Sequence, residues 1–275
     1  FSITNSKVLT FVIESDFENP KDADKNNEYL VTVRAADLSS SRTAELVIKV
    51  VDALEGRVVD GPISGASIFV DLNGDGTQNN NESSGSTNET GYFKIPQTTP
   101  VEGVIPKIIS FGGTDSKTGN SLALFSFISN IPAPVTCLSL SCVKLDSAFV
   151  TPLITVLSET ASSVDREKIL TAFEIDDTAE NLLLTDIWKS AESGNDTSKN
   201  VQRVNQKVGL LFQTANTLSG VDGLEKSLLV AKSVSSEILS LITSQNGIDL
   251  TERETVASLL KNILETTLPD STISE

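Results

Sequence analysis

The sequence predicts a multidomain fold in which all-β sandwich modules precede an all-α helical domain. The chain has 275 residues, and domains usually contain roughly 100–150 residues, so more than one domain is expected. Short segments with alternating apolar and polar residues fill the N-terminal half, whereas apolar residues recur at helical spacing from about residue 146. Because strands come first and helices follow, separate β and α domains are expected in preference to βαβ units.

Residues 1–53 are expected to form a β domain. Residues 28–37 and 43–52 alternate with a β-branched bias, and the polar residues between them predict a turn. Residues 1–12 resemble a hairpin that turns at Asn5-Ser6-Lys7, and a polar loop follows at residues 16–27.

Residues 54–145 are expected to form a second, small antiparallel sandwich. Short apolar runs in this region are separated by Gly, Pro, Asn and Asp turn signals. The two cysteines, Cys137 and Cys142, lie near its end. They could form a local disulfide in an oxidising compartment or remain as two buried thiols, and the sequence leaves both alternatives open.

Residues 146–275 are expected to form a bundle of about six helices. The first is predicted over residues 147–163 and another over residues 181–194, ending at Gly194. Trp188 lies in this second segment and is expected in the core. The clearest helical stripe consists of Val201, Val204, Val208, Leu211, Phe212, Ala215 and Leu218, and Thr251 is expected to begin the capping box of the last helix.

The motif that points to chemistry is an oxygen-rich loop between Asp71 and Glu82. It fits the calcium loop of about 12 residues, with ligands at positions 1, 3, 5, 7, 9 and 12 and glycine at position 6. The predicted calcium ligands are the side chains of Asp71, Asn73, Asp75, Asn79 and Glu82 and the backbone carbonyl of Thr77. Gly76 stands where the loop must turn sharply.

Ligands that are all oxygen favour Ca²⁺ over transition metals. The segment before the loop reads as a strand, so a structural clamp is expected instead of a paired EF-hand sensor. The alternative is an acidic, Asn- and Gly-rich surface turn that binds no metal.

A second acidic cluster, consisting of Asp16, Glu18, Asp22 and Asp24, has two readings. Alternating carboxylates can share a calcium ion, and they are equally typical of a solvated loop. Both readings stay open.

Composition excludes several classes of function. The chain has 21 Lys and Arg against 37 Asp and Glu, which gives a net charge of −16 and argues against binding nucleic acid or an anionic membrane. No apolar run approaches the roughly 18 residues that a membrane span needs, so membrane insertion is not expected. With no histidine, the Ser-His-Asp triad, the Cys-His pair and His-ligated zinc are ruled out. The absence of methionine leads us to expect a piece of a longer polypeptide.

Three segments resemble known families. "DFENPKDADKNNEYLVTVRAAD" and "LVIKVVD" resemble the second half of a bacterial cadherin-like domain, in which Asp16 and Glu18 would stand at the Asp-x-Glu calcium motif. "GRVVDGPISGASIFVDLNGDG" and "TNETGYFKIP" resemble the B-type domains of Gram-positive adhesins and the carboxypeptidase regulatory-like sandwich. "VTPLITVLSE" and "VNQKVGLLFQTANTL" are similar to a helical region of giant secreted bacterial proteins. The resemblances imply immunoglobulin-like sandwich modules and a secreted or cell-surface location.

The first of these modules has fewer residues than a complete sandwich. An immunoglobulin-like sandwich needs about seven strands and roughly 100 residues, whereas residues 1–53 precede the second module. Either the chain was trimmed here or another chain supplies the missing strands, as in strand donation between subunits.

We therefore expect a non-enzymatic, calcium-stabilised structural or adhesive module with no catalytic residues and no organic cofactor. Its expected partners are neighbouring domains, copies of itself, or cell-surface and matrix glycans. One alternative is a subunit that assembles into an extracellular filament or sheet. An alternative of another class is a polysaccharide hydrolase, which would use a pair of carboxylates.

Overall fold

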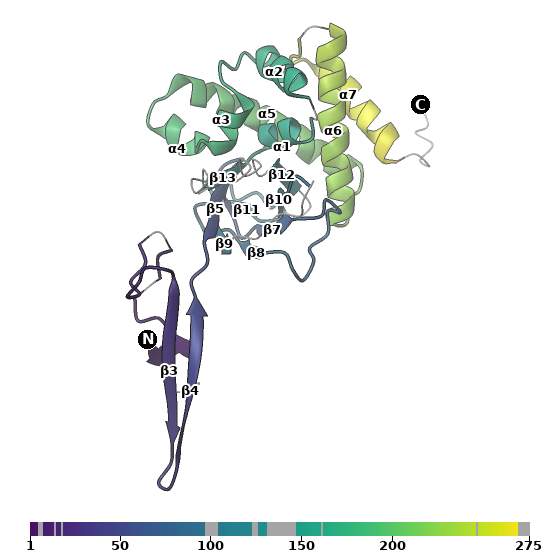
Figure 1. Ribbon diagram of the computed structural model, residues 1–275. Coiled ribbons are helices and arrows are strands. Elements are labelled where there is room, and N and C mark those ends of the chain that lie inside the picture. The colour runs from purple at the N-terminus through teal and green to yellow at the C-terminus, as the bar shows by residue number, and fades with distance from the viewer. Residues whose placement is uncertain are drawn as a thin grey trace. The chain divides into compact units, whose positions relative to one another are not determined.

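The chain folds into two compact units, Phe1–Ala53 and Leu54–Glu275 (Figure 1). The computed structural model describes all residues except 5–7, 14, 18, 97–103, 123–125, 131–146, 161, 246 and 269–275.

The described part of the first unit contains two antiparallel strand pairs. They are β1 (Ser2–Ile3) with β2 (Leu9–Thr10), and β3 (Glu28–Ala36) with β4 (Ser41–Lys49). The turn between β3 and β4 is held by Asp37, whose Oδ1 accepts the backbone N–H groups of Ser39 (2.8 Å) and Ser40 (2.7 Å). Both predicted hairpins are confirmed, although the expected turn at residues 5–7 lies outside the described residues.

One face of the β3–β4 ribbon is apolar. Tyr29, Val31 and Val33 share this face with the residues paired to them on β4. The rings of Phe1 and Phe11 lie with their centroids 5.8 Å and 5.2 Å from that of Tyr29. These three rings form a small apolar cluster at one end of the ribbon.

The second unit begins with two sheets and a short strand pair. Their strands are β5 (Ala53–Val58), β6 (Ile63–Ser64), β7 (Ser67–Asp71), β8 (Ser84–Ser86), β9 (Tyr92–Pro96), β10 (Lys107–Phe111), β11 (Thr114–Asp115), β12 (Ser126–Asn130) and β13 (Ser147–Val150). One sheet has the order β12-β10-β7-β8 and the other has the order β13-β5-β9, while β11 pairs with β6. β13 runs parallel to β5, so a strand from beyond residue 146 completes the second sheet.

The helices follow the strands along the chain and lie together on one side of the sheets (Figure 1). They are α1 (Pro152–Ser158), α2 (Ser163–Ala172), α3 (Ala179–Leu184), α4 (Ile187–Glu192), α5 (Asp196–Leu218), α6 (Leu224–Gln245) and α7 (Arg253–Thr267). The predicted order of strands first and helices second is therefore present.

The structure does not clearly show the predicted split into all-β and all-α parts. A single cluster of buried apolar residues runs from Leu54 on β5 to Ile263 on α7. It includes residues from both sheets and from all of the longer helices. Strands and helices of the second unit thus share one core, which gives it a mixed architecture.

Two predicted helix boundaries were wrong. The helix expected from residue 147 begins at Pro152, because a residue before proline is biased towards extended backbone, and residues 147–150 form β13 instead. The helix expected over 181–194 is divided into α3 and α4. Asp186 causes this division by capping α4: its Oδ1 accepts the N–H of Lys189 (3.0 Å).

Other predicted helix features had mixed outcomes. The apolar stripe of α5 is buried except for Leu218, which is 52% exposed. Gly194 has a φ of 102°, as expected for a residue that ends a helix. The capping box at Thr251 was wrong, because the N-cap of α7 is Glu252 and Thr251 donates hydrogen bonds to Asp249.

Helix α1 is buried along its whole length. All of its residues from Pro152 to Ser158 are buried, and it contacts α3, α5, α6, β12 and β13. A helix with no polar face must be enclosed by other elements, and here these elements come from both halves of the unit.

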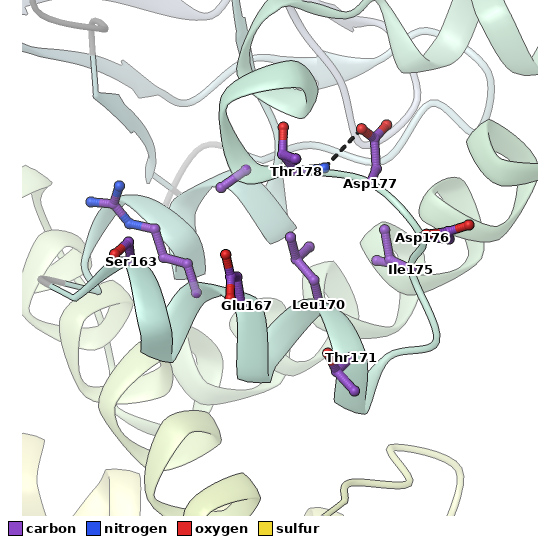
Figure 2. A pocket seen from close by; sticks show the side chains of 10 residues that line it. Ser163, Glu167, Leu170, Thr171, Ile175, Asp176, Asp177 and Thr178 are labelled. Carbon is purple, nitrogen blue, oxygen red and sulfur yellow. Dashed lines mark hydrogen bonds between the residues drawn. The ribbon is translucent and has the colours of Figure 1, made fainter.

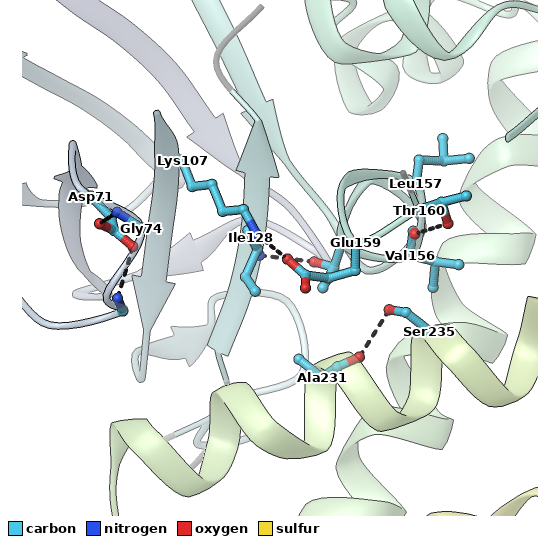
Figure 3. A network of polar contacts seen from close by, with 12 residues as sticks. Asp71, Gly74, Lys107, Ile128, Val156, Leu157, Glu159, Thr160, Ala231 and Ser235 are labelled. Atoms are coloured by element: carbon cyan, nitrogen blue, oxygen red, sulfur yellow. Dashed lines mark hydrogen bonds and ion pairs between the residues drawn. The ribbon is translucent and has the colours of Figure 1, made fainter. Parts of the chain in front are cut away.

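Buried polar contacts join α1 to its neighbours. The backbone N–H of Ile128, on the outer edge of β12, donates to Oγ1 of Thr155 on α1 (3.0 Å). Lys107 on β10 pairs with Glu159 at the end of α1, with 2.6 Å between Nζ and Oε1 (Figure 3). The side chain of Glu159 is only 10% exposed. Because β12 is the edge strand of its sheet, the bond from Ile128 shows that α1 caps this edge.

A partly buried carboxylate joins the β5–β6 turn to helix α5. A Cβ atom on Gly209 of α5 would lie 2.3 Å from Oδ2 of Asp60, so the carboxylate of Asp60 rests directly on the helix backbone. Burial raises the pKa of Asp60 to about 8, and the nearby carboxylate of Asp115 adds to the rise. Asp60 therefore gains a proton on folding between its ordinary pKa and about pH 8.

Replacing Thr155 with valine tests the bond at the sheet edge. The valine keeps the shape of the side chain but leaves the buried N–H of Ile128 without its acceptor, so we expect a loss of about 1–3 kcal/mol in the free energy of unfolding. Thr243→Val is the control, because the exposed Thr243 makes only a bond within its own helix. Urea denaturation measures both variants, and equal small losses would contradict the assignment.

Replacing Asp60 with asparagine tests its protonation. The folded state binds a proton more tightly than the unfolded state, so Asp60 makes stability fall as pH rises from about 4 to about 8, by at most about 1.4 kcal/mol per pH unit. Urea midpoints at pH 5 and pH 8 should show this fall in the wild type and a flatter profile in Asp60→Asn. The exposed Asp176→Asn is the control, and parallel profiles for all three proteins would refute the prediction.

Candidate metal-binding loop and a cavity at Trp188

The predicted calcium loop connects the end of β7 to β8. Gly76 has a φ of 73°, so the sharp turn expected at the sixth position of the loop is confirmed. Gly74 has a φ of 79° and supplies a second turn. The two glycines fold the loop back on the strand end that carries Asp71.

The carboxylates at the two ends of the loop are buried and bonded to backbone N–H groups. Asp71, which is 1% exposed, accepts from Gly74 (2.6 Å) and Gly76 (2.9 Å). Glu82, which is 7% exposed, accepts from Leu72 (2.8 Å) and Asn79 (2.8 Å). These four bonds hold the loop closed, and each carboxylate oxygen keeps a second lone pair.

The other predicted ligands gather around the carboxylate of Asp75. Its Oδ2 accepts from the side-chain amides of Asn73 (2.9 Å) and Asn79 (3.1 Å). The same amide group of Asn79 donates to the backbone carbonyl of Thr77 (3.0 Å). Amide N–H groups thus satisfy oxygens that the motif would assign to a cation.

Asp75 is the exposed negative charge of this loop. Its pKa lies below the ordinary value, first because its carboxylate accepts the backbone N–H of Thr77 and then because it accepts from Asn73 and Asn79. The carboxylate is therefore ionised at neutral pH, and a cation would have to compete with the N–H groups that it accepts.

The donor set of the loop fits a hard cation, since it consists of carboxylate, amide and carbonyl oxygens. The described residues nevertheless contain no close group of three or more Asp, Glu, Cys or His side chains that could hold a metal ion. Calcium binding would therefore need the side-chain amides of Asn73 and Asn79 to leave Asp75 Oδ2 and turn their oxygens towards the cation. The calcium site stays a prediction.

The loop also touches a helix that is distant in sequence. A Cβ atom on Gly76 would lie 2.9 Å from Cδ1 of Leu228 on α6. The turn of the loop therefore packs against the helical part of the second unit.

The structure does not group the acidic residues of segment 16–24 into a second metal site among the residues that it describes. In the acidic segment, Asp22 accepts from the backbone N–H of Asn26 (2.7 Å) and Asp24 accepts from the side-chain amide of the same residue (2.8 Å), which is how a polar turn is built. Glu18 lies outside the described residues, as do Cys137 and Cys142. Asp16 belongs to no metal-binding group among the residues that the structure describes.

The sequence did not predict the cavity that lies beside Trp188. Trp188 itself was expected in the core. Trp188 is only partly buried, and it lines a cavity of about 390 Å³ together with Arg57, Pro62, Glu89, Thr90, Ser116, Lys117, Lys189 and Glu192. These residues come from segments far apart in the chain, so no local pattern could have grouped them. The only available signal was a single tryptophan next to a lysine.

A second cavity of about 280 Å³ lies between α2 and the loop that leads to α3 (Figure 2). Glu167 and Leu170 line it from α2, and Asp176 and Asp177 line it from the loop. Asp177 accepts the backbone N–H of Thr178 (2.8 Å), so the carboxylate of this residue already serves the turn before α3.

Among the described residues, no helix combines the length and apolar character that crossing a bilayer requires. Comparison of the chain with protein-family models, with curated proteins and with solved structures found no match in any of the three.

Proposed function

We propose that this chain is a calcium-stabilised structural and adhesive module, without catalytic activity, of an extracellular or cell-surface bacterial protein. The observation that supports the proposal is the loop from Asp71 to Glu82, which keeps an all-oxygen donor set at the end of a buried strand. The resemblance of the surrounding residues to adhesin B-type and cadherin-like domains supports the location.

A cation in this loop would act on more than the loop itself. Asp71 continues directly from β7, and Gly76 packs against Leu228 of α6. Fixing the loop around Ca²⁺ would therefore stiffen the contact between the sheet and the helices. This is the mechanical role that a structural module needs.

Calcium titration into chelated protein tests the proposal. A ligand that binds only the folded state at about 100 times its Kd adds about 2.7 kcal/mol, which should raise the Tm by about 5–10 °C. Asp75→Asn removes the exposed charge and should lose most of this rise. Asp249→Asn is the matched control, because Asp249 is another turn aspartate that accepts a backbone N–H. No rise in the wild type, or an equal rise in Asp75→Asn, would exclude the site.

Assembly of copies into a filament or sheet is a second candidate function. β3 and β4 form a two-stranded sheet among the described residues, and such a ribbon is marginally stable by itself. Leu30 and Val47 face each other on it and are 69% and 67% exposed. Strands from another copy would extend the edges of this ribbon, and packing of the resulting sheets against each other would cover its exposed apolar side chains.

Negative-stain imaging tests assembly. We expect filaments in the wild type and isolated particles in a Leu30→Lys, Val47→Lys double variant, because charges on an edge ribbon oppose strand addition. A Thr243→Lys, Ser244→Lys double variant, which adds the same charge at exposed positions of α6, is the control for a general charge effect. Isolated particles of wild-type protein at every concentration and calcium level would end this candidate.

A further inference from the structure

We propose that the cavity at Trp188 binds an acidic sugar, a uronic acid unit of a polysaccharide, through Trp188, Arg57, Lys117 and Lys189. The inference gives the proposed adhesive role its ligand class, and it uses none of the residues of the calcium loop. The cavity volume of about 390 Å³ lies within the range of small-molecule sites, roughly 300–1,000 Å³.

The walls of the cavity are fixed before any ligand arrives. Oγ of Ser116 lies within hydrogen-bond distance of the carbonyl oxygens of Pro62 (2.5 Å) and Glu89 (2.8 Å), so three loops meet at this residue. The turn that carries Ser116 is held by Asp115, which is 7% exposed and accepts from the N–H of Lys117 (2.8 Å) and the hydroxyl of Thr118 (2.6 Å). A site assembled on such a framework loses little entropy on binding.

Arg57 is anchored at two points. Its Nε pairs with Asp186 at 3.2 Å, and the two side chains are 22% and 20% exposed. Its Nη1 donates to the carbonyl of Thr90 (3.1 Å). The guanidinium therefore faces the cavity in one orientation, while Asp186 also fixes the start of the helix that carries Trp188.

Trp188 presents an indole plane at the cavity. Its Nε1 donates to Glu192 (2.9 Å), one turn further along α4, which fixes the ring. The ammonium of Lys117 lies over this ring, 5.7 Å from its centroid, so a sugar that packs on the same face must displace the ammonium from it. A sugar ring has an apolar C–H face that packs on such a plane, and its hydroxyl groups project from the rim.

The charges around the cavity favour a monoanionic sugar. Three cations line the cavity in a chain whose net charge is −16, but Arg57 is already paired with Asp186. The uncompensated positive charge comes from Lys117 and Lys189, whose ammonium groups have no carboxylate partner among the described residues. They suit a carboxylate. The carboxylates of Glu89 and Glu192 would accept hydrogen bonds from the hydroxyl groups of a bound sugar, and they would repel the multiple charges of a polyphosphate.

Fluorescence provides a site-specific test, because Trp188 is the only tryptophan in the chain. The probes are trimers of galacturonate, glucuronate, mannuronate and guluronate, with maltotriose as the neutral control. All titrations contain a chelator, so that calcium cannot bridge a uronate to the protein. We expect at least one uronate trimer to change the Trp188 emission saturably, and we expect raising NaCl from 0.05 M to 0.5 M to weaken that binding.

Substitutions assign the binding to the cavity. Lys117→Gln and Lys189→Gln should each weaken the binding at least about fivefold, whereas Lys261→Gln on α7, which is an exposed lysine elsewhere, should leave it unchanged. Thermal melting confirms that each variant is folded.

Three outcomes would overturn the proposal: no change with any uronate up to about 10 mM, equal affinity for maltotriose, or equal affinity in the Lys117 and Lys189 variants. The test is independent of the calcium titration. Uronate binding without stabilisation by calcium would refute the calcium clamp alone, and the reverse result would refute this site alone.

Discussion

The enclosure of α1 is the constraint on which the rest of the second unit depends. Its seven residues are all buried, and they follow directly after β13, which pairs in parallel with β5. The start of the helix is fixed by Thr151, whose side chain caps the N–H of Ile154, and by Pro152. A buried helix inserted between a sheet and a layer of helices makes each layer part of the core of the other.

The same enclosure demands that every polar group around α1 have a partner. Asn205 on α5 accepts the N–H of Leu153 (2.9 Å), and Ser126 on β12 lies 2.7 Å from Ser227 on α6 through their hydroxyl oxygens. Such bonds contribute modestly when made, but leaving one unmade is expensive in a dry core. These bonds therefore contribute little net free energy, and their main effect is to fix the positions of the helices on the sheets.

Sequence alone could predict features that depend on local pattern. The stripe of α5 and the turn at Gly76 follow from spacing and from the freedom of glycine, and both are present. The shared core could not be predicted, because the pairing of β13 with β5 joins residues about ninety positions apart. The prediction for Trp188 was wrong for a related reason. Asp186 begins a separate helix, α4, and the cavity beside the partly buried Trp188 is lined by segments that are distant in sequence.

The acidic side chains of this chain divide by what they bond, and the division bears on how calcium would act. Asp71, Glu82 and Asp115 are buried, and each satisfies backbone N–H groups of its own loop. Where the chain turns, such carboxylates accept the backbone N–H groups that a helix or sheet would otherwise pair. The loops are therefore folded before any ligand binds. In the calcium loop, Asp75 is the carboxylate that is exposed to solvent, and its oxygens accept N–H groups of Asn73, Thr77 and Asn79. A cation would therefore tighten a loop that is already folded, and its effect should appear as stiffness and thermal stability of the whole unit.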